Sequence, residues 1–355
     1  MAGNWRNDMA AQYYSHKVIS ADAAVSSIQN GSRVFIGTGC GEPQHLIEAM
    51  VADKRLQDIM IYQMLSYTLA RYVDDPNFLD RFSLKLFFIS VSMRKAAFEG
   101  TLDYLPAYLS QIPRLFASHR IGLDVSMIQV SPPDRFGYCS LGVSVDITRS
   151  GMENSDIVIA QVNSKMPRTW GDSFVHVDDI DYLVVHEEPL VVQPFIDNQE
   201  DEVVRRIGHY VSQLVDDGST LQVGFGRVPN AILKYLSTKN DLGIHTQVIT
   251  DGFLPLLESN VITNKKKTLL PGRVVASLCM GSEELYRYID NNPIFYFRSS
   301  EFVNDPVVIA RNDNLVSISS ALEVDLTGQV CSDSKGYLVY SGIGDQVDFI
   351  RGSAM

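Results

Sequence analysis

The chain has 355 residues and a formal net charge of -12 at neutral pH. At roughly 100 to 200 residues per domain, this length predicts two globular domains. The negative charge opposes binding to nucleic acids and anionic membranes, so an anionic ligand needs a local site. The N-terminal segment has no apolar core of signal-peptide length, and no apolar run approaches the roughly 20 residues of a membrane helix. These observations predict a cytoplasmic protein.

The cysteines favour a packing role. Cys40, Cys139, Cys279 and Cys331 are far apart and form no C-x-x-C pair. This spacing argues against zinc and against a disulfide framework, and it suits a reducing cytosol. Cys40 lies in a glycine-rich turn, where a thiolate nucleophile is conceivable. Because no histidine is evident nearby to activate the thiol, a small packed cysteine is the favoured interpretation.

The first half of the chain alternates predicted strands with predicted helices. A short helix over residues 21–29, with Ser20 as its N-cap, precedes a strand over residues 33–36. The glycine-rich segment 37–41 leads to a helix and then to a strand over residues 58–62. Further strands are predicted over residues 84–89, 125–130, 156–160 and 182–185. This alternation predicts largely parallel sheets with helices packed against them.

A polar stretch over residues 197–202 is the predicted domain boundary, which gives domains 1–200 and 201–355. A helix over residues 202–215 then opens the second domain. Its apolar spacing predicts that one face packs on the core. The residues expected on this face are Val203, Ile207, Tyr210, Val211 and Leu214.

The two halves contain a repeat. NGSRVFIGTGCGEPQHLI at residues 30–47 aligns with DGSTLQVGFGRVPNAIL at residues 217–233, with one residue of slack before the proline. Two copies at this distance predict a duplicated domain and not a solenoid. At the same offset, Ile61 falls opposite Gln247. Chance similarity is the competing interpretation.

The turn Gly224–Phe225–Gly226 is the main candidate for ligand binding. It follows a predicted strand and precedes a helix that begins near Pro229. Glycines at such a turn let backbone N–H groups approach a ligand beyond the carboxyl end of a strand. A tight connection without a ligand is the alternative. The fingerprint G-x-G-x-x-G is absent and no acidic residue ends the next strand, so a nicotinamide cofactor is disfavoured.

A histidine and a run of lysines each have both a functional and a structural interpretation. His245 lies on a predicted strand over residues 245–249 and could orient a ligand, although a lone histidine on a strand is commonly structural. Lys265, Lys266 and Lys267 form the densest cationic run, which is either a solvated turn or a contact for a phosphate tail. Near the end of the chain, residues 341–346 form another strand-to-glycine turn. The chain then stops where another element is expected, which predicts further polypeptide in the native protein.

Several long blocks resemble the acetyl-CoA hydrolase/transferase family, and most closely its 4-hydroxybutyrate CoA-transferases. These blocks are MPRTWGDSFVHVDDID, DLGIHTQVITDG, FVNDPVVIARNDN, EVDLTGQVCSDS and YSGIGDQVDFIRG. The resemblance covers nearly the whole chain. It implies two similar, open, largely parallel α/β domains with the active site between them, and a homodimer. It also implies acyl-CoA and a short-chain carboxylic acid of the acetate or 4-hydroxybutyrate type as substrates, with no metal.

The resemblance implies covalent catalysis. A glutamate carboxylate attacks the thioester to give a mixed anhydride, coenzyme A thiolate returns to form a glutamyl thioester, and a second acid collects the coenzyme A. Backbone amides stabilise the oxyanion, and Gly342 and Gly344 lie in the loop that would supply them. The residues that the resemblance places around coenzyme A are Gly224, Phe225, Gly226, Arg227, Val228, Leu322, Gly344 and Gln346.

The chain departs from the family pattern at two positions. The family's glutamate lies in the block that reads GIHTQVITDG here, and its position is Gln247. A neutral amide cannot form a glutamyl thioester. At the second position the family usually has glycine, and here Asp345 brings a charge close to the acyl oxygen.

Three interpretations of Gln247 remain open. A branch of the family carries glutamine natively, with water or another carboxylate in its place, and a hydrolase is one outcome. Alternatively, the chain is an engineered glutamate-to-glutamine variant, or the protein binds acyl-CoA without turning it over. The carboxylates that could substitute are Glu258, Glu301 and Glu323.

Overall fold

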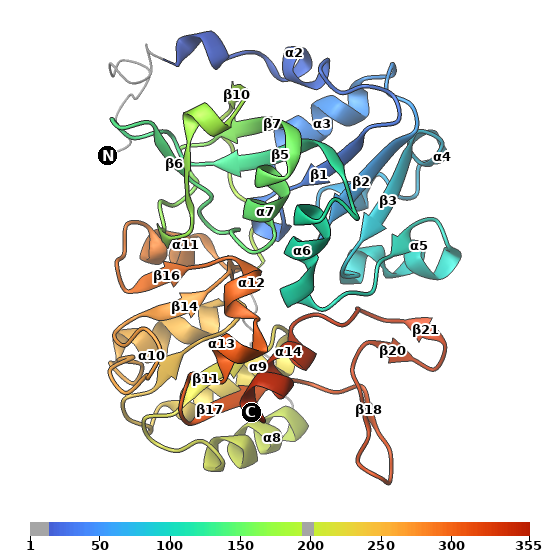
Figure 1. Cartoon of the computed structure of the whole chain (residues 1–355). Coiled ribbons are helices and arrows are strands. Elements are labelled where there is room, and N and C mark those ends of the chain that lie inside the picture. The colour runs from blue at the N-terminus through green and yellow to red at the C-terminus, as the bar shows by residue number, and fades with distance from the viewer. Residues whose placement is uncertain (1–13, 194–201) are drawn as a thin grey trace.

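A seven-stranded, wholly parallel sheet organises the first half of the chain (Figure 1). The computed structural model describes residues 14–193 and 202–355. The strand order is β10-β7-β5-β1-β2-β3-β4, and all neighbouring strands are parallel. The strands are β1 (Arg33–Ile36), β2 (Ile59–Gln63), β3 (Phe82–Leu86), β4 (Asp103–Tyr104), β5 (Leu123–Val130), β7 (Ser155–Val162) and β10 (Tyr182–Val185). The predicted strands are therefore confirmed, with β3 beginning and ending slightly before its predicted range.

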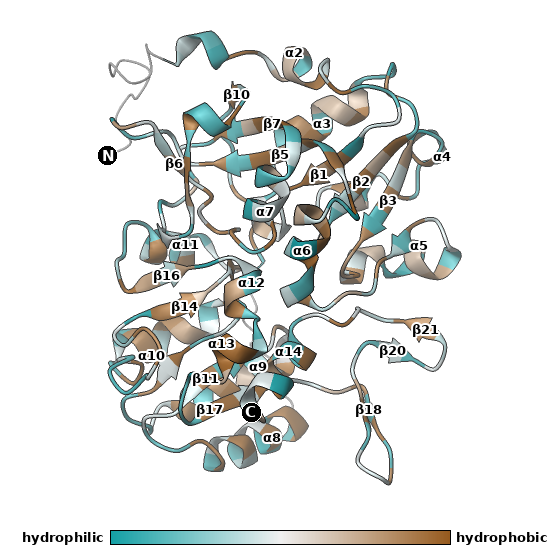
Figure 2. Cartoon of the chain, viewed as in Figure 1, coloured by the Kyte–Doolittle hydropathy of each residue, from teal (hydrophilic) through white to brown (hydrophobic). Residues whose placement is uncertain are grey.

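Helices bury both faces of this sheet, and Figure 2 shows apolar residues along its strands. Val34 and Ile36 pack with one group of helices, while Phe35, which points to the other face, packs with another. The side chain of Ser20 caps the first helix by accepting a hydrogen bond from the amide of Ala23, as predicted. The helices are α2 (Ala21–Val25), α3 (Gln44–Ala52), α4 (Pro76–Leu79), α5 (Arg94–Glu99), α6 (Ile112–Ala117) and α7 (Thr148–Glu153).

Smaller sheets organise the second half, and most of their strand pairs are parallel. The three-stranded sheets have the orders β12-β11-β17 and β14-β16-β8, and β13 pairs with β15. Because β8 comes from the first half, the two halves share one sheet. These strands are β8 (Trp170–Gly171), β11 (Thr220–Val223), β12 (Gly243–Ile244), β13 (Val248–Ile249), β14 (Val274–Ala276), β15 (Leu278–Cys279), β16 (Phe295–Phe297) and β17 (Leu315–Ile318).

Three short antiparallel pairs complete the strands. They are β6 (Tyr138–Ser140) with β9 (Phe174–His176), β18 (Glu323–Val324) with β19 (Val330–Cys331), and β20 (Ser334–Lys335) with β21 (Leu338–Val339). The remaining helices are α8 (Glu202–Gln213), α9 (Arg227–Leu233), α10 (Leu254–Glu258), α11 (Glu283–Ile289), α12 (Ser300–Val303), α13 (Pro306–Ile309) and α14 (Gln346–Ser353). Among the helices of residues 14–193 and 202–355, none combines the length and apolar character needed to cross a membrane.

Both copies of the sequence repeat form a strand, a glycine turn, a helix and a second parallel strand. The register pairs Val34 with Ile61 in the first copy and Leu221 with Ile244 in the second. Ile244 is therefore the counterpart of Ile61, and the predicted match of Ile61 with Gln247 is wrong. The connection between the strands is shorter in the second copy, so the constant offset does not hold beyond the helix.

Only Val248 and Ile249 of the predicted strand over residues 245–249 lie in a strand, and they belong to a different sheet from the residues just before them. β12 ends at Ile244 and belongs with β11, whereas β13 begins at Val248 and pairs with β15. Gln247 lies at this break. Its backbone carbonyl accepts hydrogen bonds from the amides of Ser277 and Leu278, at 3.0 and 2.9 Å. Residue 247 is thus fixed where the chain crosses from one sheet to the next.

Helix α8 exposes the face that its apolar spacing predicted to be buried. The exposed residues are Val203, Ile207, Tyr210 and Leu214, the last with 76% of its surface exposed. Val211 is partly buried. The opposite face packs inward because Gly208 approaches Tyr235 so closely that an added Cβ would lie 2.4 Å from the ring. The predicted domain boundary between residues 200 and 201 lies outside the described residues.

A buried carboxylate fixes the first glycine turn. Glu42 accepts hydrogen bonds from the backbone amides of Tyr67 and Thr68, both at 2.7 Å, and from Nε2 of Gln63 at 2.9 Å. Gln63 also donates to the carbonyl of Gly37, at 2.9 Å. Burial raises the pKa of Glu42 to about 7, although these hydrogen bonds act in the opposite direction. The carboxyl group therefore ties the end of β2 to the turn after β1.

The last glycine turn of the chain is held against the first half. The amide of Ile343 donates a hydrogen bond to the hydroxyl of Tyr104, at 2.9 Å. The carbonyl of Ser341 accepts one from the amide of Ile89, at 2.6 Å. Gly342, with a φ of 112°, lies so close to Tyr104 that an added Cβ would be 2.9 Å from the ring. Both the backbone conformation and the close approach require glycine here.

We expect Glu42→Ala to lower the free energy of unfolding by about 3 kcal/mol, because buried N–H donors lose their acceptor. Glu48→Ala is the control, since Glu48 forms a surface ion pair with Arg71. Such pairs contribute less than about 1 kcal/mol. Urea unfolding followed by circular dichroism measures both values. Equal losses in the two variants would contradict the structural role of Glu42.

We expect Gly342→Ala to destabilise the protein by about 2 kcal/mol more than Gly328→Ala. Both glycines have positive φ angles, but an added Cβ at Gly328 meets nothing within 4 Å. The difference between the variants therefore isolates the contact with Tyr104. Thermal unfolding measures it, and equal melting temperatures would show that the turn does not depend on that contact.

Candidate functional site

Phe88 lies between the two glycine turns that the sequence predicts to bind a ligand. Its ring centroid is 6.1 Å from that of Phe225. An added Cβ at Gly344 would lie 3.4 Å from the Phe88 ring. Phe88 follows β3, so three segments that are distant in sequence converge near the carboxyl ends of parallel strands. Open α/β sheets commonly bind ligands at such a position.

A chain of hydrogen bonds links β11 and β17 to the C-terminal turn. Oγ of Ser317 donates to Oε1 of Gln222 at 2.5 Å, and Nε2 of Gln222 donates to Oδ2 of Asp345 at 3.0 Å. Gln222 and Ser317 are paired neighbours on adjacent strands. Burial raises the pKa of Asp345 to about 6, and the hydrogen bond from Gln222 opposes this shift. A carboxyl group with a perturbed pKa is thus fixed at the start of α14.

The turn before Asp345 offers backbone donors. The amide of Ile343 is occupied by Tyr104. The amides of Gly342 and Gly344 donate no hydrogen bond to any residue that the structure describes. Two N–H groups on one short segment, close to Phe88, can stabilise an anionic oxygen of a ligand.

Gln247 follows a residue that contacts the strand leading into the other glycine turn. Oγ1 of Thr246 forms hydrogen bonds with the amide and the carbonyl of Val223, at 3.4 and 3.2 Å, and Val223 directly precedes Gly224. Gln247 is partly exposed, and its side-chain amide has no hydrogen-bond partner among residues 14–193 and 202–355. The side chain is therefore free to meet a ligand, although its amide cannot ionise.

The turn at residues 224–228 is partly open. The amide of Gly224 donates a hydrogen bond to the carbonyl of Ile318, at 2.7 Å. The residues that follow it, Phe225, Gly226 and Val228, are half-buried. Gly226 has a φ of 135°, and an added Cβ would meet only Pro229, at 4.0 Å. The side chain of Arg227 lies outside what the structure describes. This turn can accept a ligand on its open side.

Gln346 and Leu322, the other residues predicted to contact coenzyme A, lie in two separate parts of the structure. Gln346 is the first residue of α14 and is half-buried beside Asp345. Leu322 is 40% exposed and precedes the β18–β19 pair, which projects from the body of the molecule (Figure 1). No described contact joins Leu322 to either glycine turn. The alternative carboxylates Glu258, Glu301 and Glu323 are exposed, and no described contact joins them to Gln247.

The other candidate residues, Cys40, His245 and Lys267, are buried and serve the fold. Burial raises the pKa of the Cys40 thiol to about 12, which agrees with a packed cysteine. His245 is fully buried and hydrogen-bonded to a backbone carbonyl, and burial lowers its pKa to about 3. Lys267 is also buried, and its ammonium group donates to the carbonyls of Ile244 and Arg273 at 2.6 and 2.8 Å. The prediction that Lys267 contacts a phosphate tail is therefore wrong.

The sequence alone missed Phe88, Tyr104, Gln222 and Ser317. The signal for Gln222 was a polar residue between Leu221 and Val223 in a strand buried throughout. A buried amide requires a partner, and here the partner is a carboxylate. For Phe88 and Tyr104 no spacing in the sequence carried a signal, because their role comes from contacts with residues of the other half.

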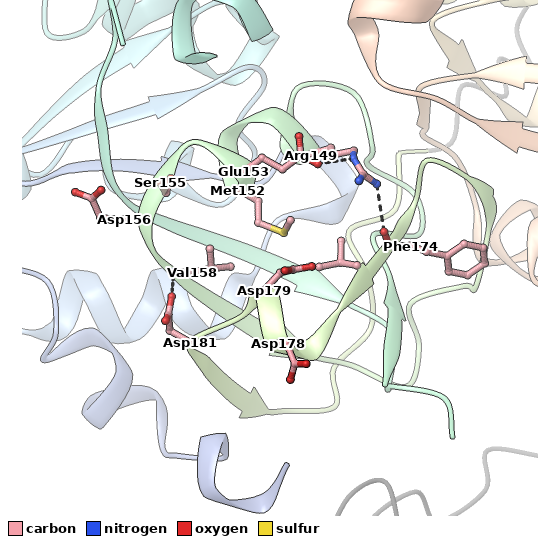
Figure 3. Close-up of a pocket in the computed structure, with 11 residues that line it drawn as sticks. Arg149, Met152, Glu153, Ser155, Asp156, Val158, Phe174, Asp178, Asp179 and Asp181 are labelled. Carbon is pink, nitrogen blue, oxygen red and sulfur yellow. Dashed lines mark hydrogen bonds and ion pairs between the residues drawn. The ribbon is translucent and has the colours of Figure 1, made fainter. Parts of the chain in front are cut away.

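A different pocket, of about 410 Å³, lies in the first half (Figure 3). Its charged lining consists of Arg149, Glu153, Asp156, Asp178, Asp179 and Asp181. Glu153 forms an ion pair with Arg149, and Asp181 accepts a hydrogen bond from the amide of Val158 at 2.8 Å. The excess of carboxylates opposes a phosphorylated ligand. Within the described ranges, no three His, Cys, Asp or Glu side chains are placed to hold a metal.

Comparisons with known proteins agree with this arrangement. Residues 2–197 match the acetyl-CoA hydrolase/transferase N-terminal domain, and residues 281–355 match the corresponding C-terminal domain. The chain is 44% identical to the 4-hydroxybutyrate coenzyme A transferase of Clostridium kluyveri, over 96% of this chain and 79% of that protein. It is 38% identical to the succinyl-CoA:acetate/propanoyl-CoA:succinate CoA transferase of Fasciola hepatica, over 95% of this chain and 70% of that protein.

Solved structures give the same result. RipA from Yersinia pestis superposes with a TM-score of 0.91 at 33% identity, covering 98% of this chain and 81% of that one. The 4-hydroxybutyrate CoA-transferase from Porphyromonas gingivalis superposes with a TM-score of 0.83 at 34% identity, covering 97% and 79%. The paired glycine turns, the parallel sheets and these matches lead to one conclusion: the chain belongs to the acetyl-CoA hydrolase/transferase family.

Proposed function

We propose that this protein binds a short-chain acyl-CoA between its two glycine turns, in a site built to transfer coenzyme A to a carboxylic acid of the acetate or 4-hydroxybutyrate type. The observation that carries the proposal is the convergence of residues 224–226 and 342–344 on Phe88. Relatives named as CoA transferases support acyl-CoA and a carboxylic acid as the two substrates. The thioester lies beside Gln247, at the position where the family carries a nucleophilic glutamate.

Different residues of this site contact coenzyme A and the thioester. Residues 224–228, together with Gln346, contact coenzyme A, and Leu322 contributes from the base of the β18–β19 pair. The amides of Gly342 and Gly344, which have no partner among the described residues, hold the thioester oxygen as it becomes negative. No step requires a metal. Hydrogen bonding by the amide of Gln247 orients the acyl group but supplies no nucleophile.

Gln247 stops the covalent route at its first step. A carboxylate oxygen attacks a thioester because it carries charge and a free lone pair, whereas the lone pair of an amide nitrogen is delocalised. The bound acyl-CoA therefore forms no glutamyl thioester in this chain. Acyl-CoA hydrolysis and acyl-CoA binding without turnover are the alternatives, and Asp345 is the carboxyl group in the site that favours the first.

The proposal also includes the domain limits, the cellular location and the oligomeric state. We assign the domains to residues 1–200 and 201–355, with the acyl-CoA at their junction. The protein acts in the cytoplasm as a homodimer, without nucleic acid or membrane partners. Sedimentation of the purified protein measures the oligomeric state directly.

We expect the wild-type chain to bind acetyl-CoA in calorimetric titration and to show no covalent adduct by intact-mass measurement. Gln247→Glu is expected to form a coenzyme A adduct and to transfer coenzyme A to an added acid, because it restores an ionisable nucleophile. Gln213→Glu, an exposed position on α8, is the control for added charge. A Gln247→Glu variant that binds acetyl-CoA normally and remains inert would overturn the assignment of residue 247.

A further inference from the structure

The carboxyl group of Asp345 is held by Gln222 through one oxygen, and the residue's own backbone amide also donates to the carboxylate. Oδ2 accepts the hydrogen bond from Gln222, and no hydrogen bond joins Oδ1 to another described residue. The residue as a whole is half-buried. A carboxyl group whose second oxygen bonds to no other described residue is suited to exchange a proton with a bound water molecule.

The orientation of this carboxyl group is determined by two strands. Ser317 donates to Oε1 of Gln222, which leaves Nε2 of Gln222 to face Asp345. Both residues lie in paired strands of one sheet, where the backbone holds them rigidly. The N–H donor favours the ionised form of Asp345, whereas burial favours the neutral form. The result is a pKa of about 6, which allows the group to accept a proton at neutral pH and to return it.

Asp345 also directly follows the proposed oxyanion donors. The free amides of Gly342 and Gly344 and the carboxyl group of Asp345 lie on four consecutive residues. A permanent negative charge here would oppose a developing oxyanion. A base that takes a proton becomes neutral at the moment when the oxyanion forms, so the total charge of the site is unchanged. The geometry therefore suits a base, and it does not suit a carboxylate that stays ionised throughout the reaction.

We propose that Asp345 is the general base that activates water against the bound thioester, so that this chain hydrolyses acyl-CoA. The inference rests on the proposed acyl-CoA site. Asp345 removes a proton from water while the water oxygen bonds to the thioester carbon. The tetrahedral intermediate then expels coenzyme A thiolate as the carbon–sulfur bond breaks, and the thiolate takes the proton from Asp345. The products are the free acid and coenzyme A, with no oxidant or reductant required.

The two departures from the family pattern then have one explanation. Gln247 removes a carboxylate from the strand side of the site, and Asp345 adds one on the loop side. An ionised Asp345 repels an anionic acceptor acid but does not repel neutral water. The same charge therefore disfavours transfer and favours hydrolysis.

The test uses the full-length chain with acetyl-CoA, and a thiol reagent measures the coenzyme A released. Hydrolysis in H₂¹⁸O is expected to place the label in acetate. Asp345→Asn is expected to lower the rate at least about 100-fold, the usual contribution of a general base, with little change in acetyl-CoA affinity. Asp325→Asn, in the projecting β18–β19 turn, is the matched control. The wild-type rate is expected to rise through about pH 6 and level off above it, since the pKa of Asp345 is about 6 and its ionised form is the active one.

Each outcome decides between named explanations. An Asp345→Asn variant that binds acetyl-CoA and hydrolyses it at the wild-type rate would overturn the inference. Wild-type protein that binds acetyl-CoA but releases none of its coenzyme A would also overturn it, and would leave the proposed binding function intact. Absence of binding would instead refute the proposed function. If Asp345→Asn fails to fold, Asp345→Gly, which carries the residue usual in the family, provides the same comparison.

Discussion

The hydrogen bond between Gln222 and Asp345 is the contact on which the site depends. It joins the end of β11 to the start of α14, two elements separated by 123 residues of chain. Tyr104 holds the same turn from the other side through the amide of Ile343. The turn is thus fixed by both halves of the molecule at once. The turn keeps its position between the two halves only while both contacts persist.

Asp345 differs from three buried groups that also have shifted pKa values. Glu42, His245 and Lys267 all have strongly shifted pKa values, and each is engaged by the surrounding backbone. Hydrogen bonds of this kind stabilise the fold and occupy the polar atoms that a ligand would need. Asp345 has a shifted pKa as well, but one of its oxygens is without a partner among the described residues. A perturbed pKa therefore indicates function here only when an accessible atom accompanies it.

Gln247 occupies a position where the fold fixes the backbone. The chain leaves one sheet at β12 and enters another at β13, and residue 247 lies between them with its carbonyl held by Ser277 and Leu278. The backbone is fixed while the side chain is left without a partner. Replacing a carboxylate by an amide at such a position changes the chemistry and leaves the backbone hydrogen bonds unchanged. On the proposed assignment of residue 247, such a replacement would keep the architecture of a transferase site and remove its nucleophile.

The sequence by itself determined the alternation of strands and helices, the parallel sheets and the glycine turns. These features depend on local spacing: apolar residues at periods of two and 3.6, and glycines where the backbone needs them. Local spacing also predicted an apolar face on α8 but not its direction, because the close approach of Gly208 to Tyr235 turned that face outward. Only the tertiary structure placed the break at Gln247, the ring of Phe88 and the partner of Asp345. Each of these depends on contacts between residues far apart in the chain, and such contacts leave no periodic pattern in the sequence.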